Sequence, residues 1–542
     1  MTAHASPLPG PLWTVLQDIV ERHPDNLALV ADDGRLTYRE LLAKVDHHAR
    51  AMLAAGLQRG DHIGVLMGNS VQWAVLWYAA ASIGLVCVPF NTRFRTEELG
   101  YGLAHEDVRA LFCVDRFLGK IDFPAMLREV EPAIDLALPG QALPLMRQVV
   151  IFGDEAPGAA LSAAHFLELG KGISDTELQA ARAAVAADDT LLIQFTSGTT
   201  AFPKGVMLSH AAMLGVAKSV AGRMDVRADD RYFSPRPFYH VAGSTMSLLV
   251  ALVEGAALVT AATFDPAQAL AIMSRECCTL TSGNDTMFLM LMADPAFATT
   301  QLYLRGGWAA ASPQILRDVV EKMGATAICN AYGLSEAAPN IVISDHREPL
   351  DYRLDGSMKP HDGLRVEIRD PQSGGVLPAG EPGEICATGW SLMKGYYKLP
   401  EQTAATLRDG WLHTGDLGVL SADGRLRFVG RLKDMFRVGG ENVSPLEVEQ
   451  VLLKHPAVEL AQVIGVPDTR LGEVPAAYVT LKSGSHVSVE ELTGFCKERC
   501  ANFKVPRFLA IVDDFESIGM TGSSKVQKGK LREHALKQFG LG

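Results

Sequence analysis

The stretch at residues 194–210, QFTSGTTAFPKGVMLSH, most constrains what this chain can fold into and bind. Before it, TLLIQF (190–195) predicts a short buried strand, and after it Ser209 can cap a helix running through Met213 and Val216. Between these elements lie hydroxyls, turn-forming glycines and one positive charge, on Thr196, Ser197, Gly198, Thr199, Thr200, Lys204 and Gly205. Since backbone N–H groups in such a turn can approach phosphate oxygens, the stretch predicts a polyphosphate-binding loop.

An ordinary solvated loop is the alternative, because clusters of Gly, Ser and Thr are common in loops. The stretch is not a P-loop of the NTPase type, since Pro203 stands where that motif requires glycine. The run TSGTTAFPKG instead resembles the phosphate-loop signature of adenylate-forming enzymes, which include acyl-CoA synthetases, peptide-synthetase adenylation domains and beetle luciferases. Ala201 departs from this signature, which usually has glycine there, and alanine disfavours positive φ.

Composition narrows the class of protein. The 542 residues are 48% hydrophobic and 21% charged, which is typical of a soluble globular chain with more than one domain. The net charge of −12 argues against nucleic acid as the main partner. The eight cysteines form no C-x-x-C pair and the first residues show no secretory signal, so we expect a reduced, cytoplasmic protein without disulfides or structural zinc.

One uncharged run, at residues 71–90, is about long enough to span a bilayer. Gly84 and Pro89 interrupt it, so we expect a buried helix over 71–83 followed by a buried strand over 85–88, and no membrane span.

Strand and helix patterns alternate through the first two-thirds of the chain. Residues 36–57 predict an amphipathic helix that begins with Thr37 and Glu40 in capping-box spacing. Strands are expected at 62–67, 110–114, 148–153 and 190–195. Short joins between strand, helix and strand imply parallel pairing, so the phosphate loop should leave the carboxyl end of a strand, where ligands of α/β sheets bind.

Two further motifs resemble the same family. PFYHVAG (237–243) opens an apolar helix through Met246, Leu248 and Val250, and the resemblance implies that His240 borders the carboxylate pocket and gates the channel between acyl group and thiol. In NAYGLSE (330–336) it implies that Tyr332 packs on adenine beside Gly333, that Ser335 binds a phosphate, and that Glu336 holds Mg²⁺, a cation that prefers hard oxygen ligands. A packed histidine and a capped Tyr-Gly turn are the alternatives.

The segment LRGGWAAASP (304–313) carries Ala310, which the resemblance assigns to the ATP site, and Trp308, where the family commonly has glycine or alanine. An indole there would shorten the acyl tunnel and favour a short, medium or cyclic acid. Alternatively, Trp308 packs outside the pocket. The expected acyl-pocket residues His240, Asn284, Trp308 and Ala331 include no obvious charge for a second carboxylate or an amine, so we expect a largely apolar acyl or aryl group.

From Gly380 the composition shifts to glycine-rich strands, and Asp423-Gly424 predicts a hairpin turn. The resemblance implies that Asp416 binds the ribose hydroxyls and that Arg431 supports ribose or phosphate; solvated turn charges are the alternative. Lys433 matches the family's hinge. We therefore expect a large adenylation domain over 1–430, made of layered α/β subdomains and a β-rich subdomain, a hinge at 431–434, and a small mobile α+β domain over 435–542.

The small domain carries two further matches. Gly439, Gly440 and Glu441 resemble the loop that lines the CoA tunnel, and Ser444 to Glu447 has capping-box spacing with proline at the first helical position. TGSSKVQKGK (521–530) resembles the family's tail and places Lys525 on the catalytic lysine. Ser524 replaces the usual glycine, and Lys528 and Lys530 keep the assignment open.

Together the motifs imply a two-step ligase that uses ATP, Mg²⁺ and coenzyme A, with Lys525, His240, Thr196 and Glu336 as its catalytic groups. The substrate would be a small carboxylic acid, most plausibly medium-chain, cyclic or aryl. Two alternatives stay open: an enzyme that loads a carrier protein, and an inactive nucleotide-binding regulator. A homodimer is compatible with the sequence.

Overall fold

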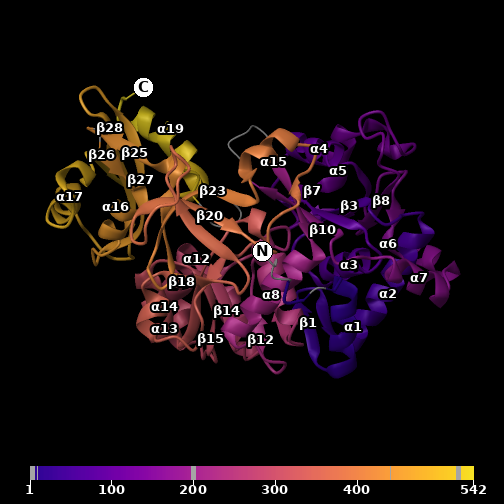
Figure 1. Ribbon diagram of the computed structural model, residues 1–542. Helices are drawn as coiled ribbons and strands as arrows, with labels where there is room; N and C mark the ends of the chain where they lie inside the picture. The colour runs from indigo at the N-terminus through magenta and orange to yellow at the C-terminus, as the bar shows by residue number, and fades with distance from the viewer. Residues whose placement is uncertain (1–5, 9, 197–202, 440, 521–525, 542) are drawn as a thin grey trace.

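The computed structural model describes residues 6–8, 10–196, 203–439, 441–520 and 526–541 (Figure 1). The uncharged run forms α3 (Val71–Ser82) and β4 (Val86–Pro89), as predicted. No helix within the described residues has the length and apolar character needed to cross a membrane.

A first sheet lies in the N-terminal part of the chain. Its described strands follow the order β21-β11-β10-β4-β3-β5-β8-β9. Their bounds are β3 (His62–Leu66), β4, β5 (Val108–Val114), β8 (Gln148–Phe152), β9 (Leu161–Ser162), β10 (Thr190–Thr196), β11 (Lys204–Ser209) and β21 (Gly395–Tyr396). The strands predicted at 62–67, 110–114, 148–153 and 190–195 are confirmed, and β3 pairs in parallel with β4 and β5.

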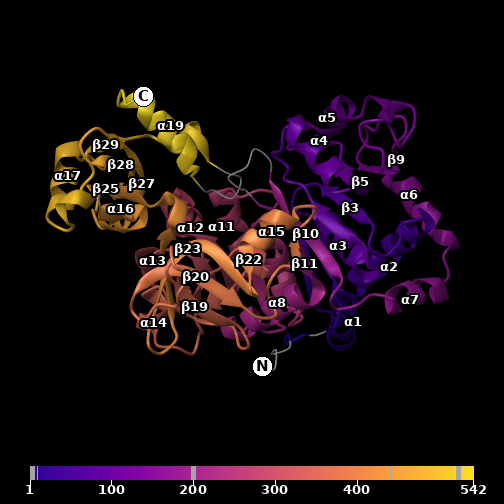
Figure 2. The same cartoon turned by 45° about the horizontal axis from the view of Figure 1, so that its top comes forward.

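Helices cover both faces of this sheet. The helices α2 (Tyr38–Ala54) and α3 pack on one face, and α4 (Thr96–His105) and α5 (Phe123–Val130) on the other (Figures 1 and 2). Neighbouring strand residues point to opposite faces, so Val65 joins the first core and Leu66 the second. The predicted capping box of α2 is present, since Thr37 and Glu40 each bind the other's backbone N–H. Helices α6 (Ala163–Leu169) and α7 (Asp175–Ala183) follow.

A second, longer sheet crosses the large part of the molecule in the order β19-β20-β23-β24-β18-β17-β16-β15-β14-β12-β13-β1-β2, with β22 beside β23. The strands are β1 (Leu27–Ala31), β2 (Gly34–Thr37), β12 (Arg231–Phe233), β13 (Ala257–Val259), β14 (Leu280–Asn284), β15 (Gly306–Ala310), β16 (Ala327–Tyr332), β17 (Val342–Ile343), β18 (Ser357–Pro360), β19 (Arg365–Arg369), β20 (Pro382–Thr388), β22 (Leu407–Arg408), β23 (Trp411–Leu420) and β24 (Leu426–Arg431). Pairing is parallel from β12 to β16 and antiparallel from β17 onward, and the predicted hairpin at Asp423-Gly424 joins β23 to β24.

The helices of this part are α1 (Leu12–Arg22), α8 (His210–Met224), α9 (Val241–Gly243), α10 (Val250–Leu252), α11 (Pro266–Arg275), α12 (Asp285–Ala293), α13 (Pro313–Met323), α14 (Leu350–Leu354) and α15 (Pro400–Thr406). Ser209 caps α8 as predicted, because its side chain accepts a hydrogen bond from Ala212 N. The apolar helix after His240 is present but is π-helical over Ser244–Leu249 (η3), between α9 and α10.

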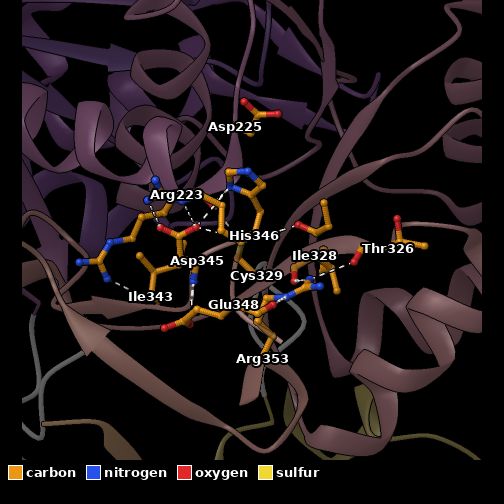
Figure 3. Close-up of polar contacts among 12 residues, drawn as sticks. Arg223, Asp225, Thr326, Ile328, Cys329, Ile343, Asp345, His346, Glu348 and Arg353 are labelled. Atoms are coloured by element: carbon orange, nitrogen blue, oxygen red, sulfur yellow. Dashed lines mark hydrogen bonds and ion pairs between the residues drawn. The ribbon is translucent and has the colours of Figure 1, made fainter. Parts of the chain in front are cut away.

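Two arginines, Arg353 and Arg223, bind backbone oxygens at β16, which ends at Tyr332, and at its neighbour β17 (Figure 3). Arg353 donates from Nη1 to the backbone oxygens of Thr326 (2.9 Å) and Ile328 (2.8 Å). Arg223 donates to the backbone oxygen of Ile343 on β17 at 2.7 Å. Each guanidinium therefore satisfies carbonyls at strand ends, which fixes β16 and β17.

The C-terminal residues form a separate unit with its own core. Its described strands are β25 (Phe436–Val438), β26 (Glu441–Val443), β27 (Val458–Asp468), β28 (Gly472–Leu481) and β29 (Phe508–Ile511), and its helices are α16 (Pro445–Leu452), α17 (Val489–Lys497), α18 (Glu516–Gly519) and α19 (Lys528–Gln538). The short helix η6 (Leu432–Asp434) joins it to β24 (Figure 2). A large α/β part and a smaller α+β part confirm the predicted fold class.

One local prediction in this unit is wrong. Pro445 begins α16 as expected, but the Ser444 side chain does not cap it. Its hydroxyl donates instead to the backbone oxygen of Val429 on β24, at 3.0 Å, and so bridges the two units. Glu447, the other half of the expected capping box, pairs with Lys504 at 2.6 Å.

Candidate active site

The two strands that flank the phosphate loop, β10 and β11, pair as a hairpin. The loop's first and last described residues, Thr196 and Lys204, face each other where β10 and β11 pair, and Thr196 Oγ1 donates to Lys204 O at 3.5 Å. The loop leaves the carboxyl end of β10 as predicted. The strand β11 was not predicted; because it runs antiparallel, the chain returns along β10 before α8 begins. Ser197, Gly198, Thr199 and Thr200 lie outside the described residues.

A row of side chains leads from this hairpin to the predicted metal ligand. Lys204 Nζ lies 4.7 Å from the ring centroid of Tyr396 on the neighbouring strand β21. The Tyr396 hydroxyl donates to Glu336 Oε1 at 2.8 Å, and Met393 N donates to the backbone oxygen of Glu336, also at 2.8 Å. Burial, reinforced by the Glu336 carboxylate, raises the pKa of Tyr396, so this hydroxyl stays protonated and donates. Tyr396 therefore contacts both Lys204 and Glu336.

A buried acid lies beneath the hairpin. A methyl group on Gly205 would lie 2.6 Å from Glu106 Oε1, so only glycine lets β11 pass over this carboxyl. His105 Nδ1 is 2.9 Å from the same oxygen, while Glu106 Oε2 is buried without a hydrogen-bond partner in the described structure. Burial raises the pKa of Glu106 to about 8.

The predicted adenine and ribose residues are brought together on the second sheet. Tyr332, at the end of β16, donates from its hydroxyl to Asp416 Oδ2 at 2.8 Å. Its ring stacks on Phe428 with centroids 5.2 Å apart. Asp416 pairs across the β23–β24 hairpin with Arg431, whose Nε is 3.5 Å from Asp416 Oδ1. Both carboxylate oxygens of this buried aspartate thus point toward site residues.

Gly333 and Ser335 continue directly from Tyr332. Gly333 is exposed, and a methyl group there would lie 2.0 Å from Pro339 O, so the chain turns too tightly for a side chain. Ser335 begins the short helix η5 (Ser335–Ala337), which carries Glu336. The NAYGLSE segment therefore links the predicted adenine end of the site to the predicted metal ligand.

Three of the four predicted acyl-pocket residues, Asn284, Trp308 and Ala331, lie on adjacent parallel strands. Asn284 ends β14 and caps α12, and it faces Ala310 at the exposed end of β15. Trp308 on β15 and Ala331 on β16 are buried. These residues share the carboxyl edge of the sheet with Tyr332, as expected for a ligand site of parallel strands.

Trp308 is contacted at its indole nitrogen by Tyr232 and on the face of its ring by Arg236. Its Nε1 donates to the Tyr232 hydroxyl at 2.7 Å, and the residue is only 4% exposed. Tyr232 in turn donates to Met246 O at 3.0 Å, in the π-helical segment after His240. The guanidinium carbon of Arg236 lies 5.0 Å from the indole centroid. The indole is therefore part of the wall between β15 and the helix that His240 begins.

His240 is the residue before α9, and its Nδ1 accepts a hydrogen bond from Ala242 N at 3.1 Å. The preceding residue is tied to the phosphate-loop strand, since Gln194 on β10 donates from Nε2 to Tyr239 O at 2.7 Å. This contact places the histidine loop against the end of β10.

The remaining predicted residues belong to the junction and the small unit. Lys433, the predicted hinge residue, lies in η6 between the two units, and its role as a hinge stays a prediction. Gly439 (φ +59) and Glu441 flank the turn between β25 and β26, in a sheet that among the described strands is separate from the large ones. Gly440 and Lys525 lie outside the described residues. Lys528, the alternative to Lys525 as the catalytic lysine, binds Glu449 Oε1 at 2.7 Å within the small unit.

Sequence reasoning missed several residues of the site. Tyr396 follows the glycine-rich stretch as GYY, and only its strand pairing with β11 reveals its role. Arg236 stands four residues before His240 and gave no motif signal. The structure also brings together Glu384, Cys386 and His413, whose ligand atoms lie within 4.8 Å of one another across β20 and β23. His413 Nδ1 is 2.8 Å from Glu384 Oε2, so these groups pair with each other.

Comparison with known proteins agrees with this arrangement. Residues 16–397 match the family model of the AMP-binding enzymes, and residues 447–525 match that of the AMP-binding enzyme C-terminal domain. The chain is 36% identical over 540 residues to YngI of Bacillus subtilis (strain 168), named as an acyl-CoA synthetase, with 97% of each chain covered. It is 33% identical over 542 residues to the medium-chain acyl-CoA ligase ACSF2 of Danio rerio, covering 97% of this chain and 88% of the relative.

A solved structure is also similar over nearly the full length. The anthranilate CoA ligase AuaEII in complex with anthranoyl-AMP superposes with a TM-score of 0.86 at 25% identity, with 99% of both chains covered. The chain therefore belongs to the family of AMP-binding, adenylate-forming enzymes, within which it is an AMP-forming acid–thiol ligase of the acyl-CoA synthetase type.

Proposed function

We propose that this enzyme converts a medium-chain, cyclic or aryl carboxylic acid to its CoA thioester, through an acyl-adenylate, with release of AMP and pyrophosphate. The observation that carries the proposal is the line of contacts from the phosphate-loop hairpin through Lys204 and Tyr396 to Glu336. Glu336 follows Tyr332 by four residues, and the Tyr332 hydroxyl binds Asp416. The names of its relatives support a medium-chain or aryl acid.

In the first step, a carboxylate oxygen of the acid attacks the α-phosphorus of ATP, and the bond from that phosphorus to the pyrophosphate oxygen breaks. Both reactants are anions, so the step needs positive charge where negative charge accumulates. Lys204 and the hydroxyls and N–H groups of residues 196–200 would bind the phosphates. Ala310, Gly333 and Tyr332 would border the adenine, Asp416 and Arg431 the ribose, and Ser335 a phosphate.

Glu336 would hold Mg²⁺. Its carboxylate supplies the hard oxygen ligands that this cation prefers, and Tyr396 donates to one of its oxygens and orients the group. When bound, Mg²⁺ would offset the charge of the triphosphate.

In the second step, the CoA sulfur attacks the acyl carbonyl carbon, the bond to AMP breaks, and the thiol proton is lost. Lys525 has no use here, so we infer that the small domain (435–542) turns about a hinge at 431–434, centred on Lys433, and exchanges Lys525 for Gly439, Gly440 and Glu441. The separate core of residues 436–541 supports this division. His240 would gate the channel between acyl group and thiol.

The test is pyrophosphate release with ATP, Mg²⁺ and CoA across fatty, benzoic, cinnamic and alicyclic acids. CoA consumption that peaks at one acid class supports the proposal and identifies that class. Pyrophosphate release without CoA consumption would favour loading of a carrier protein, the alternative that the sequence left open. No release with any acid would contradict the proposal. A cytoplasmic location and a homodimer stay predictions.

A further inference from the structure

Arg236 carries a buried guanidinium for which the described residues supply no hydrogen-bond acceptor. It lies between β12 and His240 and is 8% exposed. Its Nε and Nη2 are both buried and have no hydrogen-bond partner in the described structure. The guanidinium lies over the face of Trp308, with its carbon 5.0 Å from the ring centroid.

Other buried arginines show what such a group normally does. Arg353 donates to two backbone carbonyls, Arg182 pairs with Asp46, and Arg425 pairs with Glu348 at 2.7 Å. Among the arginines that are buried in the described ranges, Arg236 alone has neither a carboxylate nor a carbonyl acceptor for its side chain. A buried charge without a partner costs several kcal/mol in general, so its presence indicates a ligand that compensates it.

The backbone around Arg236 is fixed. Asn69 Nδ2 donates to Arg236 O at 2.9 Å, and Asn69 Oδ1 accepts from Phe238 N at 2.7 Å. Thr260 Oγ1 is bound to the same amide at 2.9 Å. The loop that carries the guanidinium is therefore anchored to a distant part of the chain, which holds Arg236 in a defined place.

The Arg236 side chain contacts a residue of the predicted acyl pocket. Arg236 faces Trp308, a predicted pocket residue, and precedes His240 by four positions. Ser234, two residues before Arg236 in the chain, places its Oγ 2.7 Å from Ser247 Oγ and 3.0 Å from Ser282 Oγ. Burial lowers the pKa of Arg236 to about 10, so the group is still charged at neutral pH.

We propose that Arg236 binds an oxygen acceptor at the far end of the acyl group, away from the reacting carboxylate. This inference rests on the proposed function and refines its substrate class, because it replaces the largely apolar acyl group expected from sequence with one that carries a second carboxylate or a keto group. A second carboxylate fits best, since two oxygens match the guanidinium fork and its charge offsets the buried cation.

The experiment compares matched acids of equal length. We would measure kcat/KM with ATP and CoA for hexanoate against hexanedioate, octanoate against octanedioate and 7-oxooctanoate, and 4-methylbenzoate against terephthalate. At one length, the oxygen-bearing acid should be preferred by at least ~10-fold, because a site built to hydrogen-bond a substrate rejects the analogue that lacks the group. Comparing octanedioate with 7-oxooctanoate then shows whether the acceptor is a carboxylate or a keto group.

Arg236→Met keeps the length of the side chain and removes its donors. It should reverse this preference, lowering kcat/KM for the oxygen-bearing acid ~100-fold while raising it for the unsubstituted acid. Arg231→Met is the matched control. Arg231 begins β12, whereas Arg236 follows the end of that strand, and Arg231 donates to Glu276 O at 2.9 Å. This control should leave the ratio of the two acids unchanged.

The outcomes separate this inference from the function on which it rests. If the wild-type enzyme activates some acid but prefers the unsubstituted member of every pair, the assignment of Arg236 is wrong and the ligase function stands. If no acid is activated, both the ligase function and the assignment of Arg236 are wrong. Should Arg236→Met fail to fold, the kcat/KM ratios of the wild-type enzyme for the paired acids test the assignment alone. Arg236→Lys, which keeps the charge but loses the planar fork, should reduce the preference for the oxygen-bearing acid without reversing it.

Discussion

Glu106 makes the stability of the protein depend on pH. Its pKa is raised to about 8 in the folded state, against an ordinary value of 4.5. Below pH 4.5 the carboxyl is neutral in both states. As pH rises from 4.5 to about 8, the unfolded chain loses this proton while the folded chain keeps it, so stability falls through that window and levels off above it.

Glu106→Gln removes this dependence. Compared with the wild type, the variant should melt at nearly the same temperature at pH 5 and higher at pH 9, by roughly 1–3 °C for a chain of this size. Differential scanning calorimetry at both pH values measures the difference. Glu97→Gln, an exposed change in α4, the helix that Glu106 follows, is the control. Equal shifts for Glu106→Gln at the two pH values would contradict the account.

Asp416 is expected to act on nucleotide binding more than on folding. Asp416→Asn keeps the shape and one acceptor for the Tyr332 hydroxyl, but it removes the charge that faces Arg431. We expect KM for ATP to rise roughly 10-fold, the size of one charge-assisted hydrogen bond, with little change in melting temperature. Steady-state pyrophosphate release measures this. The hairpin variant Asp423→Asn should behave as wild type, and an unchanged KM for Asp416→Asn would remove Asp416 from the ribose site.

At the level of strands, Trp308 lies between β15 and the π-helical segment after His240, and its Nε1 donates to Met246 O in that segment. The indole is fixed by Tyr232 and lies on the face of Arg236. Trp308→Gly, the residue common in the family, should lengthen the acyl site and shift the preferred fatty acid toward longer chains. A chain-length series of kcat/KM measures this; Trp390→Gly, which alters an indole bound to Asp362 O, is the control. An unchanged profile would mean that Trp308 only packs.

The elements themselves were largely predictable from sequence. Apolar runs bounded by turns predicted β3, β5, β8 and β10, because their patterns are local. The strand β11 was missed, since KGVMLS follows the loop directly and gains its partners from β10 and from β21, which lies far along the chain. For the same reason Ser444 was misassigned: its local pattern predicts a cap, whereas a contact across the two units takes its hydroxyl. Arg236 was missed because an unpaired buried charge has no signature in sequence.

The division of the chain into two units underlies a prediction about the two half-reactions. Lys525→Ala should lose adenylation by about 100-fold or more, because one preorganised charge is missing. It should keep much of the thioester step when supplied with preformed acyl-adenylate. Both half-reactions can be followed separately by pyrophosphate and CoA assays. Lys530→Ala is the control. Equal loss of both steps in a folded variant would count against a role confined to the first.

The edge strand β21 also bears on how the chain is made. The hairpin edge at β11 is covered by Gly395 and Tyr396, and Tyr397 N donates to Gly205 O at 2.8 Å. A ribosome synthesises this cover about 190 residues after the hairpin itself. Throughout that interval β11 is an open edge with unpaired N–H and C=O groups, which other chains can pair with. The same strand that completes the nucleotide site therefore ends a period of aggregation risk, and nascent chains should need chaperone protection until residue 397 has left the exit tunnel.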